Sequence, residues 1–345
     1  MSIVEAVVPG VAARSVRPAV ALVAAILVLV AVTLLSVAVG AKSIPLGGVV
    51  DALFAYDDGN ADHLIVRSLR VPRTILGLLV GAALGAAGAA MQGLTRNPLA
   101  DPGILGVNAG AALFVVIGIY SFDVTSILGS VWFAFAGAAL ASVVVYSLGS
   151  LGREGATPVK LALAGAALTA LLGSITTAVL LLDVETLDQF RFWIVGSLAG
   201  RSSTIAMGVA PFIGIGLVLA LASGPMLNTL ALGDDVARGL GARVGWSRVA
   251  GATCIVVLCG AATAAAGPIA FVGLAIPHVA RAITGPDFRW ILPFSIVLAP
   301  ILLLGADIIG RVVARPGEVQ VGIITAILGA PVFIALVRSR KVAEL

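Results

Sequence analysis

The sequence predicts an all-α integral membrane protein, because it is rich in hydrophobic residues, poor in charge and divided into long apolar stretches. Of its 345 residues 60% are hydrophobic and only 11% are charged. An ordinary soluble domain carries about 25% charged residues, so this chain has too few charges to cover a water-exposed globule of its size. The composition therefore excludes a soluble enzyme and a disordered scaffold. The 21 Lys and Arg residues are scattered, which argues against nucleic acid as a partner.

Nine stretches without Asp, Glu, Lys or Arg follow one another along the chain, and a transmembrane helix needs roughly 20 mostly apolar residues. The stretch over residues 249–280 is long enough for more than one crossing, and Gly267-Pro268 interrupts it, because this pair breaks a helix. Dividing it there gives ten predicted transmembrane helices in a single domain, residues 1–345. The first stretch is too long for the apolar part of a signal peptide. The predicted spans are residues 18–41, 74–95, 102–122, 124–152, 161–182, 202–233, 249–266, 269–283, 290–306 and 319–337.

Basic residues in the predicted loops favour a cytoplasmic N-terminus. With this orientation 13 of the 21 Lys and Arg residues lie on the cytoplasmic side, and 10 of the 17 acidic residues lie outside. That distribution agrees with the positive-inside rule. An even number of helices then places both termini in the cytoplasm.

The predicted spans contain almost no ionisable groups. Asp307 and His278 lie at the ends of two spans, whereas a transporter driven by an ion gradient usually carries acidic residues or histidines within its spans. None of the three lysines follows a glycine, so the sequence lacks the G-x-x-x-x-G-K-[ST] loop that binds nucleotide phosphates. We therefore expect that the chain is not itself an enzyme. Active transport would require a separate ATP-hydrolysing subunit that contacts a cytoplasmic feature of this chain.

Residues 226–241 fit such a contact, since they are too short to span a membrane and too apolar for an ordinary loop. We expect two short amphipathic helices, with a turn at Gly233, an N-terminal cap at Asp234 and an end at Gly241. The alternative is a linker that lies on the bilayer surface. The predicted coupling residues are Leu227, Leu230, Leu232, Gly233, Asp234, Ala237, Arg238 and Leu240.

Arginines gather on the predicted outer side, against the general charge bias. Arg70 and Arg73 precede the second span, and Arg311 follows the ninth. Arginine binds carboxylates through paired hydrogen bonds, so these side chains are candidate contacts for an acidic partner. The alternative is that they anchor in lipid headgroups.

Small and polar residues mark two of the spans. Gly77, Gly81 and Gly85 recur at every fourth position of the second span and predict a central helix that packs closely on all sides. Hydroxyl groups on the fifth span either line a transport pathway or bond back to their own helix. The pathway candidates are Thr169, Ser174 and Thr177.

Taken together and in order, the motifs resemble the FecCD family of ABC-importer permeases. The resemblance covers most of the chain from about residue 65 onward. The matching segments are RVPR at 70–73, RNPLADP at 96–102, LALAG at 161–165, WIVGSL at 193–198, LALG at 230–233, GPIAFVGL at 267–274 followed by Pro277-His278, ADIIGR at 306–311, GIITA at 322–326 and GAPVF at 329–333.

This resemblance implies a type II ABC importer permease fold with ten helices. Two permease subunits, identical or different, would enclose a central pathway, and two cytoplasmic ABC ATPases would bind ATP and Mg²⁺. The chain itself would bind no cofactor and would lie in the plasma membrane of a bacterium. The cargoes of the family are iron-siderophores, haem and cobalamin, of which an iron(III)-siderophore is the commonest.

The resemblance also implies roles for particular residues. Residues 227–240 would contact the ATPases, and Arg70, Arg73 and Arg311 would pair with glutamates of an extracytoplasmic solute-binding protein. The cytoplasmic gate would lie near Thr157, Pro158 and Val159, where relatives often carry small hydroxylated residues.

Three other functions have less support in the sequence. A zinc or manganese ABC permease would need several His or acidic ligands, whereas the chain has two histidines, and Cys254 and Cys259 match no metal motif. No metal site is therefore predicted. A gradient-driven secondary transporter built on repeats would need carboxylates inside the membrane. An intramembrane enzyme would need paired aspartates, a Ser/His couple or a metal cluster in the spans.

Overall fold

The computed structural model describes residues 18–152 and 157–338, and every regular element within them is a helix. The longer helices are α1 (Pro18–Ala38), α4 (Val71–Thr95), α5 (Val107–Phe122), α6 (Ile127–Gly149), α7 (Pro158–Leu182), α9 (Ser203–Ala222), α12 (Val244–Ala266), α13 (Val272–Thr284), α14 (Phe288–Val313) and α15 (Val321–Arg338). The shorter ones are α2 (Leu46–Phe54), α3 (Ala61–Leu64), the π-helical η1 (Ile65–Arg70), the 3-10 helix η2 (Pro102–Leu105), α8 (Val184–Ile194), α10 (Gly224–Ala231) and α11 (Asp234–Gly239).

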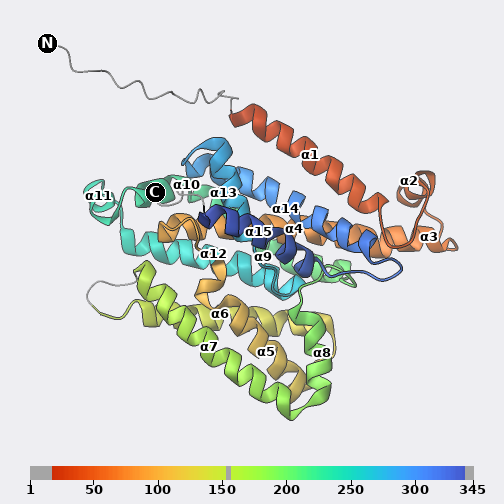
Figure 1. The fold of residues 1–345 in the computed structure, drawn as a ribbon, viewed down its shortest axis with the longest axis horizontal. Coiled ribbons are helices and arrows are strands. Elements are labelled where there is room, and N and C mark those ends of the chain that lie inside the picture. Colours follow the sequence, from red (N-terminus) through yellow and green to blue (C-terminus); the bar gives the residue numbers. More distant parts are fainter. Residues whose placement is uncertain (1–17, 153–156, 339–345) are drawn as a thin grey trace.

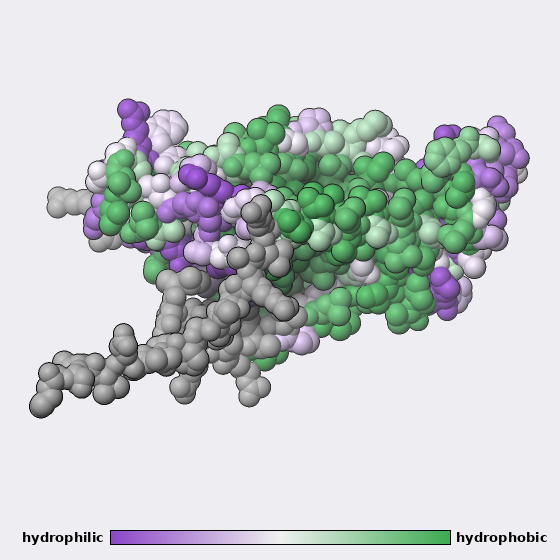
Figure 2. Space-filling view, turned by 90° about the horizontal axis from the view of Figure 1, so that it is seen from above, coloured by the Kyte–Doolittle hydropathy of each residue, from purple (hydrophilic) through white to green (hydrophobic). Residues whose placement is uncertain are grey.

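The two ends of the molecule differ in polarity from its middle. In Figure 2 hydrophobic side chains cover the middle of the face in view, and hydrophilic side chains gather towards both ends. One end carries α10 and α11 and the other carries α2 and α3 (Figure 1). We call them the α10–α11 end and the α2–α3 end. An apolar belt between polar ends is expected of a protein that spans a bilayer.

Each predicted span overlaps one of the longer helices over most of its length, which confirms the fold class. Seven helices, with Ala61–Thr95 taken as one, are long and apolar enough to cross a membrane, and α5, α13 and α15 are shorter apolar helices. α13 begins at Val272, later than the predicted residue 269, because Gly267 and Phe271 both have positive φ angles (+76° and +69°) that interrupt the helix. The number of crossings and the cytoplasmic position of the termini stay predictions.

α4 is the central helix, as the glycine spacing predicts. It packs against α9, α12, α13 and α14, and every residue from 80 to 95 is buried. A Cβ atom at Gly81 would lie 2.6 Å from Pro300 Cα of α14, and one at Gly88 would overlap the backbone of Gly273 in α13. Only glycine permits these helices to approach so closely.

Two regions flank this centre. α1 lies along α14 at the periphery, and Ser36 is its only buried residue (Figure 1). α5, α6 and α7 pack together and lie against α12 through α5 and α6. α1 and α7 therefore present long exposed apolar faces, which in a membrane would contact lipid or another protein.

The second predicted span is longer than expected. A continuous helix runs from Ala61 through α3, η1 and α4, whereas the sequence analysis began the span at residue 74. Asn60 sets the start, because its side chain accepts a hydrogen bond from the backbone N of Asp62 (2.9 Å). Arg70 and Arg73 therefore lie on this helix and are buried, so the prediction that the helix begins after them is wrong, whereas their position on the outer side stays a prediction.

Candidate functional site

α10 and α11 lie at one end of the molecule (Figure 1). Leu227, Leu230 and Ala237 are buried. Leu232, Val236 and Leu240 follow one another at intervals of four residues and are exposed, Leu232 to 59% and Leu240 to 66%. We call these three residues the apolar ridge. An apolar ridge at a polar end of the molecule is a candidate contact for another protein.

Asp234 ties this helix pair to the spanning helices. Its carboxylate accepts hydrogen bonds from Arg248 Nη2 of α12 (2.8 and 3.0 Å), and Arg96 Nη2 at the end of α4 lies 3.4 Å away. The prediction that Asp234 caps α11 is wrong. Gly233 (φ +97°) holds the cap position, and no side-chain hydrogen bond caps this helix within the described chain. Arg238 pairs with Asp235 at 3.0 Å on the exposed side of α11.

Asn228, which the sequence analysis did not single out, joins α10 to α14. Its Oδ1 accepts a hydrogen bond from the backbone N of Phe288 (2.8 Å), and its Nδ2 donates to Asp287 Oδ1 (2.6 Å). Asp287 also accepts from the backbone N of Arg289 (2.9 Å). These hydrogen bonds, that from Asn228 foremost, stabilise the ionised carboxylate and lower the pKa of Asp287. The feature of the sequence that could have indicated this contact is the amide of Asn228 within a short and mostly apolar helix.

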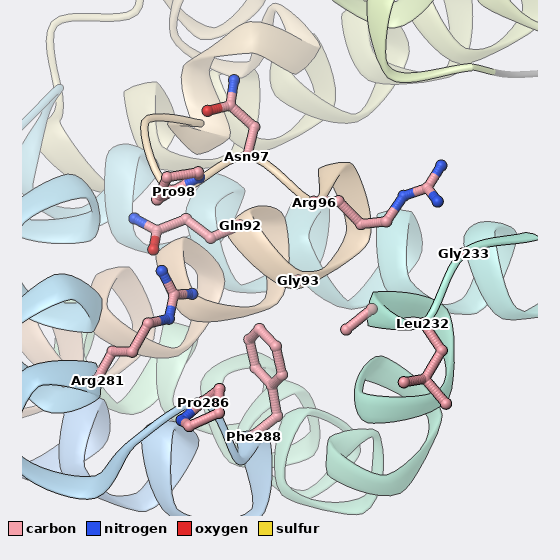
Figure 3. A pocket seen from close by; sticks show the side chains of 11 residues that line it. Gln92, Gly93, Arg96, Asn97, Pro98, Leu232, Gly233, Arg281, Pro286 and Phe288 are labelled. Atoms are coloured by element: carbon pink, nitrogen blue, oxygen red, sulfur yellow. The ribbon is translucent and has the colours of Figure 1, made fainter. Parts of the chain in front are cut away.

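A pocket of about 570 Å³ lies between the helix pair and the spanning helices. Figure 3 shows that its walls come from the end of α4, the α10–α11 junction, the end of α13 and the start of α14. Arg96 and Arg281 line it, and no acidic residue does so among the described residues. The pocket is therefore positively charged.

Arg73 and Arg311 meet at the α2–α3 end and share one buried carboxylate. Arg73 donates to both oxygens of Asp307 through Nε and Nη2 (2.7–3.1 Å), and its Nη1 donates to Glu318 Oε2 at 2.6 Å. Arg311, only 1% exposed, donates to Asp307 from the following turn of α14. We call Arg70, Arg73, Asp307 and Arg311 the arginine cluster. A charge this deeply buried requires such partners.

Backbone carbonyls at the end of α1 and in the residues just after it accept hydrogen bonds from the other N–H groups of Arg70 and Arg311. Arg311 donates to the carbonyl oxygens of Ser36 (2.7 Å) and Val39 (3.0 Å). Arg70 donates to those of Ala38 and Lys42, each at 2.6 Å. The cluster therefore fastens the end of α1 to η1 and α14.

A cavity of about 360 Å³ opens beside the arginine cluster and is lined by Arg70, Arg73, Arg311 and Glu318. The three arginines lie together in space, as their predicted positions on one side of the membrane suggest. Their burial and their hydrogen bonds within the chain were not predictable from the sequence, which does not show the pairing of Arg73 with Asp307. Their contact with a binding protein stays a prediction.

The predicted gate residues begin α7. The Thr157 side chain accepts a hydrogen bond from the backbone N of Lys160 (3.4 Å), and Val159 is exposed. The backbone of Pro158 opens the helix, and its side chain lies outside the described part. Further along α7, Ser174 and Thr177 are exposed and donate to the carbonyl oxygens of Ala170 and Gly173 (2.9 Å each). Thr169 is exposed on the same helix. Their part in a pathway stays a prediction.

Comparison with known proteins identifies close relatives. The model of the FecCD transport family matches residues 10–339. The ferric enterobactin transport system permease protein FepD of Escherichia coli (strain K12) is 49% identical over 302 residues, 87% of this chain and 90% of FepD. The cobalamin import system permease protein BtuC of Halobacterium salinarum is 37% identical over 284 residues, 82% of this chain and 76% of that protein. A solved metal-chelate type ABC transporter in an inward-facing conformation matches with a TM-score of 0.81 at 26% identity, covering 92% of this chain and 99% of the other.

Proposed function

Because the chain belongs to the FecCD transport family, we propose that it is the permease subunit of an ABC importer for an iron(III)-siderophore complex, placed in the plasma membrane of a bacterium. The observation that carries the proposal is the match to the family along almost the whole chain. Haem or cobalamin is the alternative cargo, and the cobalamin relative is the observation in its favour. Residues 1–345 would form one permease domain that binds no cofactor.

The proposed topology has ten crossings, with both termini and the α10–α11 end in the cytoplasm. Arginines at the α10–α11 end support this orientation, since cytoplasmic segments are enriched in basic residues. They include Arg96, Arg238, Arg248, Arg281 and Arg289.

ATP and Mg²⁺ would bind to two separate ATPase subunits, which would cover the apolar ridge. Two sets of polar contacts would carry their movement into this chain. Asp234 links α11 to α12 through Arg248, and Asn228 links α10 to α14. Since α12 and α14 both pack on α4, a displacement of the helix pair would reach the centre of the bundle. Net transport requires that the outward and inward states bind their partners with different affinities.

The solute-binding protein would dock at the α2–α3 end. Acidic side chains of that protein would approach the arginine cluster through the cavity beside it, because the guanidinium groups are otherwise buried. The exposed face of α7 would meet a second permease subunit, identical or different, around the pathway, with the gate at Thr157, Pro158 and Val159.

Reconstitution tests the proposed function. Vesicles that contain the permease, its ATPase and its binding protein should accumulate ⁵⁵Fe-siderophore only when ATP is present on the ATPase side. Uptake driven by a proton gradient in vesicles without the ATPase would contradict the importer proposal. Uptake of cobalamin or haem in place of the ferric complex would establish the alternative cargo.

A further inference from the structure

Arg281 extends into the pocket at the α10–α11 end, and no acidic residue in the described part of the chain forms an ion pair with it. It lies on the last turn of α13, and Figure 3 shows its guanidinium directed towards Gln92. Its Nη1 is shielded from solvent and has no hydrogen-bond partner within the described chain. Its nearest ring contact is Phe288, whose centroid lies 5.9 Å from the guanidinium carbon.

Gln92 lines the same pocket and also has an unsatisfied atom. Its side chain is 1% exposed, and its Nε2 donates to the carbonyl oxygen of Leu274 (3.1 Å). Its Oε1 is buried and receives no hydrogen bond from the described residues. A buried acceptor and a buried donor are thus both left unpaired in one cavity, which costs free energy unless a ligand or a small rotation pairs them.

Within the described residues, no ion pair balances the charge of Arg281 in the pocket. Arg96, the other arginine in its wall, faces Asp234 at 3.4 Å, and Asp234 itself is held by Arg248. Among the described residues, no carboxylate forms an ion pair with Arg281. A carboxylate that entered the pocket would therefore meet a cation already stripped of much of its water, where a charge-assisted hydrogen bond is strong.

We propose that this pocket receives an acidic side chain of the ATPase subunit, and that Arg281 binds its carboxylate through paired hydrogen bonds. The guanidinium has five N–H groups, so it can hold a carboxylate and also donate to Gln92 Oε1. The inference rests on the proposed function, because it names the chemistry of one contact in the proposed interface.

The position of Leu232 favours a protein side chain as the occupant. Leu232 belongs to the apolar ridge and also lines the pocket. A protein that covers the ridge would therefore place its own side chains at the mouth of the pocket. The pocket is thus continuous with the surface assigned to the ATPase.

Carbodiimide cross-linking of the assembled complex tests the contact directly. The reagent joins an amine to a carboxylate in direct contact, and the wild-type chain has only three lysines. The variant Arg281→Lys keeps the charge and adds one amine in the pocket. Arg289→Lys is the matched control, since Arg289 is exposed at the same end and does not line the pocket. We expect mass spectrometry to find residue 281 joined to an Asp or Glu of the ATPase, and residue 289 not joined.

Affinity measurements provide the second readout. In nanodiscs of neutral lipid, Arg281→Gln should weaken binding of the ATPase about tenfold or more, and Arg289→Gln should change it less than about twofold. Equal effects of the two variants, or the absence of a cross-link at residue 281 in an assembled complex, would overturn the inference. So would an effect that appears only with anionic lipid or is reproduced by added inorganic phosphate, since the bound anion would then not be a side chain. Failure of the wild-type chain to bind any ABC ATPase would instead count against the proposed function.

Discussion

Arg73 of α4 and Asp307 of α14, 234 residues apart in the sequence, form a bidentate ion pair inside the helix bundle. Asp307 is completely buried and also binds Arg311, so one carboxylate compensates two guanidinium groups. The second carboxylate on Arg73 is that of Glu318, whose side chain is 31% exposed. The pair holds the two most extensively packed helices of the fold together at one end.

Loss of the Asp307 charge should destabilise the protein. Asp307→Asn leaves two buried arginines with too little negative charge, and removal of one partner from a buried ion pair typically costs about 3–5 kcal/mol. Thermal unfolding of the purified permease, followed by loss of the monodisperse species, measures the effect. Glu318→Gln is the control, because a partly exposed pair contributes up to about 1 kcal/mol. Equal stability of the two variants would show that the burial of a carboxylate does not determine how much its ion pair with Arg73 stabilises the protein.

Two leucines of the coupling segment should respond differently to the same substitution. Leu227 is buried and Leu232 is exposed. Leu227→Ala should lower the free energy of unfolding by about 2–5 kcal/mol, because it leaves a cavity. Leu232→Ala should leave stability within about 0.5 kcal/mol but weaken ATPase binding and ATP-driven uptake. If Leu232→Ala leaves both binding and uptake unchanged, the apolar ridge is not a contact.

The helices were predictable from the sequence, because length and the absence of charge are local properties. The absence of charge was a poor guide at Arg70 and Arg73, because the helix begins before them and both charged side chains are buried in it. A buried charge without a partner would destabilise the protein. The two buried arginines are stabilised by Asp307 and by a backbone carbonyl at the end of α1. A single sequence does not show pairs of residues that lie so far apart along the chain. For the same reason Asp234 was read as a local cap, although its partner Arg248 lies on another helix. The role of Asn228 was not predictable because its partners, Asp287 and the backbone of Phe288, lie far along the chain.

Stability should fall in acid through Asp287. Hydrogen bonds lower the pKa of this carboxyl in the folded protein below its ordinary value of about 3.9. An acid with a depressed folded-state pKa contributes stability that is fully present above its unfolded-state pKa and is lost as pH falls through the folded-state value. Wild type should therefore be more stable than Asp287→Asn at neutral pH, and the difference should begin to shrink near about pH 4 and continue to shrink as the pH falls further. A difference that stays constant from pH 7 to pH 3 would contradict this assignment.

Glu318 should compete with the docking partner for Arg73. Its carboxylate takes the Nη1 group of Arg73 and lines the cavity through which an external carboxylate would approach. Glu318→Gln removes the competing charge while Asp307 still holds the other side of the guanidinium. We expect this variant to bind the solute-binding protein a few-fold more tightly, measured with the permease in nanodiscs at low salt, where electrostatic contacts are least screened. Glu185→Gln is the control, because Glu185 is an exposed carboxylate at the start of α8 that does not line this cavity. Weaker binding of the Glu318→Gln variant, with an unchanged control, would instead make Glu318 a support for the docking surface, because the loss would then come from a misplaced Arg73.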